Sequence, residues 1–232
     1  MSKTGVIGAM ELEVSMIKDQ MENKTITVIA GMEFCEGMVN GADCVIVRSG
    51  VGKINAAVCA QILIDCFHVT HIINTGVAGS LNPRFQIGDL LISADAIQHD
   101  VDGLNFGYPL GEIPQLGITA FQADKRMVQI AEDIATRDFT DITAIVGRVL
   151  TGDQFIADIQ KKKQIIDLFH GDCCDMEGAA IAHCAYLNQI PFVIIRAISD
   201  NASGTAGIDY FTFEKEAAKV SARLVASMLS EI

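Results

Sequence analysis

The sequence predicts an α/β fold in which one mixed central sheet is flanked by helices. Apolar, branched runs typical of buried strands alternate with helical segments along the whole chain. Residues 26–48 interrupt this alternation with three consecutive strands, which makes the sheet mixed. The chain has 232 residues and half are hydrophobic, enough for a large core. No repeat or linker is visible, so we expect a single domain spanning residues 1–232.

The strands and helices are expected in a definite order. Asn40-Gly41 is a hairpin signal between two strands, and Asp124 and Asp158 begin helices. A short strand is expected to end at Asp175-Met176-Glu177. The other expected strands lie at 4–9, 26–30, 33–39, 43–48, 71–75, 89–97, 142–150 and 192–195, and the helices at 10–22, 54–67, 124–136, 158–169, from 178 onward, and 212–229.

Two turns rich in small residues are expected at the carboxyl edge of the sheet, where α/β folds bind ligands. Residues 49–55 (SGVGKIN) join a strand to a helix, and their amides can face an anion or a polar ligand. The spacing fits neither a Walker loop nor a dinucleotide-binding loop. The second turn, residues 76–80, contains Val77, Ala78 and Gly79. Small residues there indicate tight packing or close approach of a ligand, and the presence of two such turns favours the ligand.

Two acids, Glu177 and Asp200, are expected at the same edge, and Glu13 is a candidate for a third. Glu13 lies in the first turn of a helix, Glu177 follows a short strand, and Asp200 ends the strand from Phe192. Each alone has a structural explanation, as a helix cap or as a partner of the helix dipole. Glu177 and Asp200 occur together on two neighbouring strands beside Arg196, and this combination favours a catalytic role.

Two further segments are candidates for ligand or subunit contacts. Residues 99–118 lack periodicity but contain aromatics and prolines, which indicates an ordered contact loop at a subunit boundary. Phe155 comes just after the strand at 142–150. Its ring either packs in the core or stacks on a flat ligand.

Composition excludes several classes of function. A net charge of −12 argues against nucleic-acid and anionic-membrane surfaces. The one basic run, residues 161–163, is expected to be a solvated helix face. The seven cysteines have no repeated spacing and indicate buried thiols of a reducing compartment. No metal-ligand motif, leader or membrane-spanning run is visible, so we expect a cytoplasmic protein without a bound metal.

Six motifs in order support a family resemblance. They are GAMELEV at 8–14, SGVGKINAA at 49–57, INTGVAGSL at 73–81, TGDQFI at 151–156, DMEGAA at 175–180 and RAISD at 196–200. Together they closely resemble the bacterial 5′-methylthioadenosine/S-adenosylhomocysteine nucleosidases, from the first strand to the last helix. The resemblance implies a nucleoside-phosphorylase-like fold, a homodimer, a role in methionine salvage, no cofactor, and hydrolysis of the bond between adenine and the thioribose.

The resemblance also assigns roles residue by residue. Glu13 matches the acid that orients or deprotonates water, and Asp200 matches the acid that protonates the leaving purine. Glu177 and Met176 match the residues that hold the ribose hydroxyls, with Ser199 and Arg196 beside them as orienting groups. The other matched positions are Phe155 and Ile156 for adenine, Met10, Val51 and Tyr210 for the alkylthio pocket, and Phe106 and Pro114 for the part of that pocket supplied by the partner subunit.

Two departures and two alternatives stay open at this point. The family often has Ser at the position of Val77 and Phe at that of Tyr210, which leaves the substrate preference undetermined. One alternative is a phosphate-dependent purine nucleoside phosphorylase, with Arg48 as a possible phosphate ligand. The acidic first turn, with Glu11 beside Glu13, argues against phosphate there. A non-catalytic nucleoside-binding protein is the second alternative.

Overall fold

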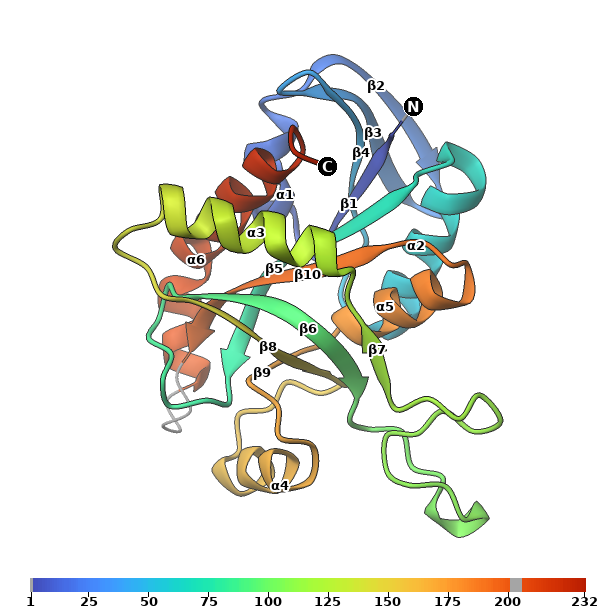
Figure 1. Cartoon of the computed structure of the whole chain (residues 1–232), viewed down its shortest axis with the longest axis vertical. Helices are drawn as coiled ribbons and strands as arrows, with labels where there is room; N and C mark the ends of the chain where they lie inside the picture. The colour runs from blue at the N-terminus through green and yellow to red at the C-terminus, as the bar shows by residue number, and fades with distance from the viewer. Residues whose placement is uncertain (1, 201–205) are drawn as a thin grey trace.

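A ten-stranded mixed sheet forms the centre of the molecule (Figure 1). The computed structural model describes residues 2–200 and 206–232, with side chains described up to residue 200 and from residue 213. The strands are β1 (Thr4–Gly8), β2 (Glu22–Ile29), β3 (Met32–Val39), β4 (Ala42–Arg48), β5 (His71–Ser80), β6 (Leu90–Gln98), β7 (Ala120–Gln122), β8 (Ala144–Thr151), β9 (Cys173–Asp175) and β10 (Phe192–Asp200). The helices are α1 (Glu11–Lys18), α2 (Lys53–Phe67), the 3-10 turn η1 (Leu104–Phe106), α3 (Lys125–Asp138), α4 (Ile159–Phe169), α5 (Gly178–Leu187) and α6 (Ala206–Met228).

Five of the strands close into a ring. The order β10-β6-β8-β9-β5 is completed by a direct pairing of β10 with β5. From β5 the sheet continues through β1, β4, β3 and β2, the last three as an antiparallel meander. Asn40 and Gly41 both have positive φ, as the tight hairpin between β3 and β4 requires. The expected mixed α/β sheet is therefore confirmed.

Helices cover the sheet in separate groups (Figure 1). Helices α1, α3 and α6 pack together against β5, β6 and β10, over a core that includes Val14, Ile134 and Leu224. Helices α2 and α5 contact each other over a second core. Helix α4 packs separately, through Ile165 and Phe169, on residues of β6, β8 and β9. The loop between β6 and β7, drawn in green, extends away from the body.

Three expectations about the elements were wrong. The first helix ends at Lys18, and Glu22 begins β2, because residues 22–29 pair with β3 instead of continuing the helix. The small residues 76–80 do not form a turn. They continue β5, because that strand has hydrogen-bonded neighbours on both sides, β10 and β9.

The third error concerns the relation of the strands that end in acids. Strands β9 and β10 are not neighbours, because β5 lies between them and pairs with both. Gly79 of β5 is opposite Asp200 on one side and Cys174 on the other. The acids that follow β9 and end β10 therefore meet across the small residues of β5.

Candidate active site

A cavity of about 600 Å³, including its open mouth, lies where β1, β5, β9 and β10 end. The sequence motifs meet there although they are far apart in the chain. The lining residues are Ala9, Met10, Glu13, Val51, Val77, Ala78, Gly79, Gln154, Phe155, Ile156, Cys174, Asp175, Met176, Glu177, Ser199 and Asp200.

Glu13 projects from the first turn of α1 and is almost fully buried. Its Oε2 accepts a hydrogen bond from the Met10 amide at 2.9 Å, and its Oε1 accepts one from the Val77 amide at 3.0 Å. Gly76 makes room for the carboxylate, because a Cβ there would lie 2.5 Å from Oε1. Burial raises the pKa of Glu13, and this outweighs the lowering by the Arg196 charge and the backbone amides. The group is held rigidly and is poised to take up a proton.

Glu177 lies at the start of α5, directly after Met176. Its Oε1 accepts a hydrogen bond from the Gly52 amide at 2.8 Å, so the glycine-rich loop positions this carboxylate. Burial, followed by the nearby negative charge of Asp175, raises the pKa of Glu177 to about 7. The Glu177 side chain therefore changes charge near neutral pH.

Asp200 is the last residue of β10 and is buried at the cavity wall. Its Oδ1 accepts a hydrogen bond from the Ser199 hydroxyl at 3.1 Å. Its Oδ2 lies 3.2 Å from Nζ of Lys162, which reaches it from α4. Gly79 leaves the space for the carboxylate, since a Cβ there would lie 3.1 Å from Oδ2.

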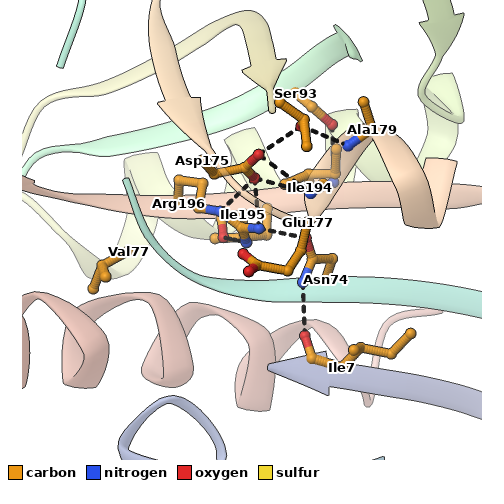
Figure 2. Close-up of polar contacts among 12 residues, drawn as sticks. Ile7, Asn74, Val77, Ser93, Asp175, Glu177, Ala179, Ile194, Ile195 and Arg196 are labelled. Carbon is orange, nitrogen blue, oxygen red and sulfur yellow. Dashed lines mark hydrogen bonds and ion pairs between the residues drawn. The ribbon is translucent and has the colours of Figure 1, made fainter. Parts of the chain in front are cut away.

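A buried ion-pair network supports the acids from behind. Figure 2 shows the guanidinium of Arg196 between Asp175 and Asn74. Arg196 donates to Asp175 Oδ2 from Nε at 3.0 Å and from Nη2 at 2.7 Å, while Thr151 donates to the other oxygen. Burial alone would lower the pKa of Arg196, but the charges of Asp175, Glu13 and Glu177 raise it. The network places a permanent positive charge near the two glutamates.

Most of the site residues proposed from the sequence line this same cavity. Arg196 does not line it, and acts on the site from the buried network. Phe106, which is 84% exposed, and Pro114 lie on the loop outside it. Tyr210 falls on α6 in the stretch whose side chains lie outside the described residues. The proposed residues that do line the cavity are Met10, Glu13, Val51, Val77, Ala78, Gly79, Phe155, Ile156, Met176, Glu177, Ser199 and Asp200.

Sequence reasoning missed several residues of the site. Ala9, Gln154, Cys174 and Asp175 also line the cavity; Ala9, Gln154 and Asp175 lie inside motifs already singled out, and Cys174 directly precedes one. The expectation that residues 161–163 form a solvated face was wrong for Lys162, which is buried against Asp200. No local signal distinguishes this lysine from its neighbours, because its partner is 38 positions away.

The arrangement suits acid–base chemistry on a neutral ligand. Carboxylates from three separate parts of the chain reach one partly apolar cavity. Over the described residues, no group of three or more His, Cys, Asp or Glu side chains is arranged to hold a metal ion. In the same part of the chain, no helix is both long and apolar enough to cross a membrane.

Comparison with known proteins places this fold in a defined class. The family model described as the phosphorylase superfamily matches residues 3–230, so the fold is that of this superfamily. A relative from Geobacillus kaustophilus, a 5′-methylthioadenosine/S-adenosylhomocysteine nucleosidase, is 42% identical over 98% of this chain and 97% of its own. The chain belongs to the 5′-methylthioadenosine/S-adenosylhomocysteine nucleosidase family of the phosphorylase superfamily.

Solved structures of this family match closely. The Neisseria meningitidis nucleosidase in complex with methylthio-immucillin-A has a TM-score of 0.96 and 36% identity, and all of both chains is covered. The Colwellia psychrerythraea nucleosidase in complex with adenine has a TM-score of 0.95 and 36% identity, over 99% of this chain and 95% of that one.

Proposed function

We propose that the chain is a hydrolase that cleaves the N-glycosidic bond of 5′-methylthioadenosine and S-adenosylhomocysteine. The products are adenine and the corresponding thioribose. The observation that carries this proposal is the convergence of Glu13, Glu177 and Asp200 on one cavity. The relatives named for this activity, and their complexes with adenine and an immucillin, support it.

Each acid has a distinct role in this proposal. Glu13, with a raised pKa, takes the proton of the attacking water. Glu177, with Met176, holds the ribose hydroxyls, and its negative charge stabilises the positive charge that develops on the sugar as the bond breaks. Asp200 protonates the purine, because adenine is a poor leaving group as an anion. Phe155 and Ile156 hold the adenine ring.

The remaining lining positions have supporting roles in the proposal. The strand residues Val77, Ala78 and Gly79 allow close approach of the ligand, and the Val77 amide holds Glu13. Ser199 orients Asp200 through its hydroxyl. Met10 and Val51 form the wall of the alkylthio pocket, with Tyr210 as a further member.

Phosphate as the nucleophile is the competing function, and the charge of the cavity argues against it. No described residue that lines the cavity is Lys or Arg, whereas phosphate sites favour such cations. Arg48 is exposed and does not line the cavity. The test is product analysis on methylthioadenosine with and without phosphate. Free thioribose formed without phosphate supports the hydrolase, while a strict phosphate requirement and a ribose 1-phosphate product would assign a phosphorylase.

The proposal extends to the assembly and location of the protein. Phe106 and Pro114 lie on an exposed loop away from the cavity of their own chain, which suits a homodimer in which they complete the partner's alkylthio pocket. We also propose that the chain is a single catalytic domain of the cytoplasm. It works without a cofactor or metal and contributes to methionine salvage.

A further inference from the structure

Lys162 is a buried lysine on helix α4. It is 2% exposed and shares the inner face of α4 with Ile165 and Phe169. Its neighbour Lys163 is exposed on the same helix. Burying an ammonium group costs several kcal/mol unless a partner compensates, so the position of Lys162 requires an explanation.

The partner is the acid assigned to the leaving purine. Nζ of Lys162 lies 3.2 Å from Oδ2 of Asp200, and the side chains are 2% and 3% exposed. Asp200 lines the cavity but Lys162 does not, so the lysine contacts the carboxylate from behind the cavity wall. Ser199 donates to the other oxygen at 3.1 Å. Both oxygens are thereby held while the carboxylate still lines the cavity.

Stability alone is a poor reason for such a pair. Apolar residues of similar size commonly stabilise a fold as well as a buried ion pair does. A positive charge beside a carboxylate favours the ionised form and resists its protonation. The lysine therefore affects whether Asp200 carries the proton that a leaving purine needs.

We propose that Lys162 is a positioning residue for Asp200, which fixes the direction of the carboxylate and sets the pH range over which turnover occurs. This inference rests on the proposed function, because it concerns the acid of the same reaction. It adds a residue that does not line the cavity and that acts through Asp200.

None of the other groups that the structure describes near Asp200 supplies the same effect. From β9, Cys174 faces the pair, and burial raises the pKa of its thiol to about 12, so it stays neutral. Asp175, also on β9, is already paired with Arg196. From β5 the neighbour is Gly79, which carries no charge. Among the described residues, Lys162 supplies the positive charge in direct contact with Asp200.

The experiment compares the pH profile of kcat/KM for methylthioadenosine in variants at this site. Lys162→Met removes both charge and hydrogen bond, Lys162→Gln keeps a donor without the charge, and Lys162→Arg keeps the charge. Lys163→Met is the matched control on the same helix. Thermal melts establish which variants are folded, and Lys162→Gln decides the question if Lys162→Met does not fold.

Removing the charge should let Asp200 keep its proton at higher pH. In Lys162→Met and Lys162→Gln, the ratio of kcat/KM at alkaline pH to kcat/KM at acid pH should be about ten-fold or more above the wild-type ratio. The reason is that a nearby opposite charge shifts the pH of proton binding by about 1–3 units. The Lys162→Arg and Lys163→Met variants should keep the wild-type shape. Neutral variants with the wild-type shape, or an equal change in Lys163→Met, would overturn the proposal. A wild-type enzyme that needs phosphate would refute the hydrolase instead, and the comparison of profiles would still test Lys162.

Discussion

Replacing Glu13 by Gln tests the proposed general base with little change of shape. In the wild type each carboxylate oxygen accepts one backbone hydrogen bond, from Met10 and from Val77. The two oxygens have about four acceptor positions, so the carboxylate can still bind and deprotonate a water molecule. The glutamine amide cannot accept a proton. Loss of a general base typically lowers turnover by about 10²–10⁴-fold, and we expect a decrease of this size.

The same substitution has a structural cost that can be separated from the chemical one. Glutamine keeps one acceptor oxygen, but its NH₂ group then faces one of the two backbone donors. A buried donor without a partner costs about 1–3 kcal/mol. For a chain of this size, each kcal/mol lowers Tm by about 2–4 °C, so the variant should be destabilised but folded.

The assay is adenine release from methylthioadenosine, with a thermal melt of each variant. Glu11→Gln is the matched control, because Glu11 belongs to the same helical turn, is 54% exposed and pairs with Lys18 outside the cavity. It should keep wild-type turnover. If Glu13→Gln also stayed within about tenfold of the wild type, Glu13 could not be the general base, since that role requires at least about 10²-fold.

Three further predictions concern the other acids and the loop. Asp200→Asn should lose about 10²–10⁴-fold in turnover but still bind adenine by calorimetry, and near-normal turnover would exclude Asp200 as the acid. Glu177 is neutral below its pKa of about 7, so kcat/KM should rise as the pH increases through that value. The Glu177→Gln variant should lack this rise. If the rise were unchanged in the variant, it would belong to another group. Phe106→Ser should raise KM, while light scattering should show a dimer of unchanged mass. A wild-type protein that is monomeric and fully active would contradict the proposed shared pocket.

Local signals predicted most elements of the fold because those signals act over a few residues. Asp124 caps α3 through the amides of Arg126 and Met127, as its position before an amphipathic segment indicated. The hairpin at Asn40-Gly41 depends on two residues that adopt positive φ. The errors arose where pairing partners were remote. Residues 22–29 became a strand because β3 was available to pair with them.

The sequence likewise predicted one part of the candidate site, its lining residues, but not the buried contacts behind them. The motifs located the residues that line the cavity, because a ligand-binding edge concentrates Gly, small residues and acids in short stretches. They did not indicate that Arg196 lies behind the cavity, bound to Asp175 and Asn74. They also did not indicate that β5 lies between β9, which precedes Glu177, and β10, which ends at Asp200.

The sequence by itself determined the class of fold, the order of the elements and the acids available for the reaction. These depend on hydrophobic periodicity, turn residues and short motifs, all of which are local. Only the tertiary structure decided which charges are buried and what they contact. Lys161, Lys162 and Lys163 are identical residues in sequence, yet only Lys162 faces inward on α4 toward Asp200. The charge state of a buried group depends on partners brought together from distant parts of the chain, and no local pattern encodes that contact.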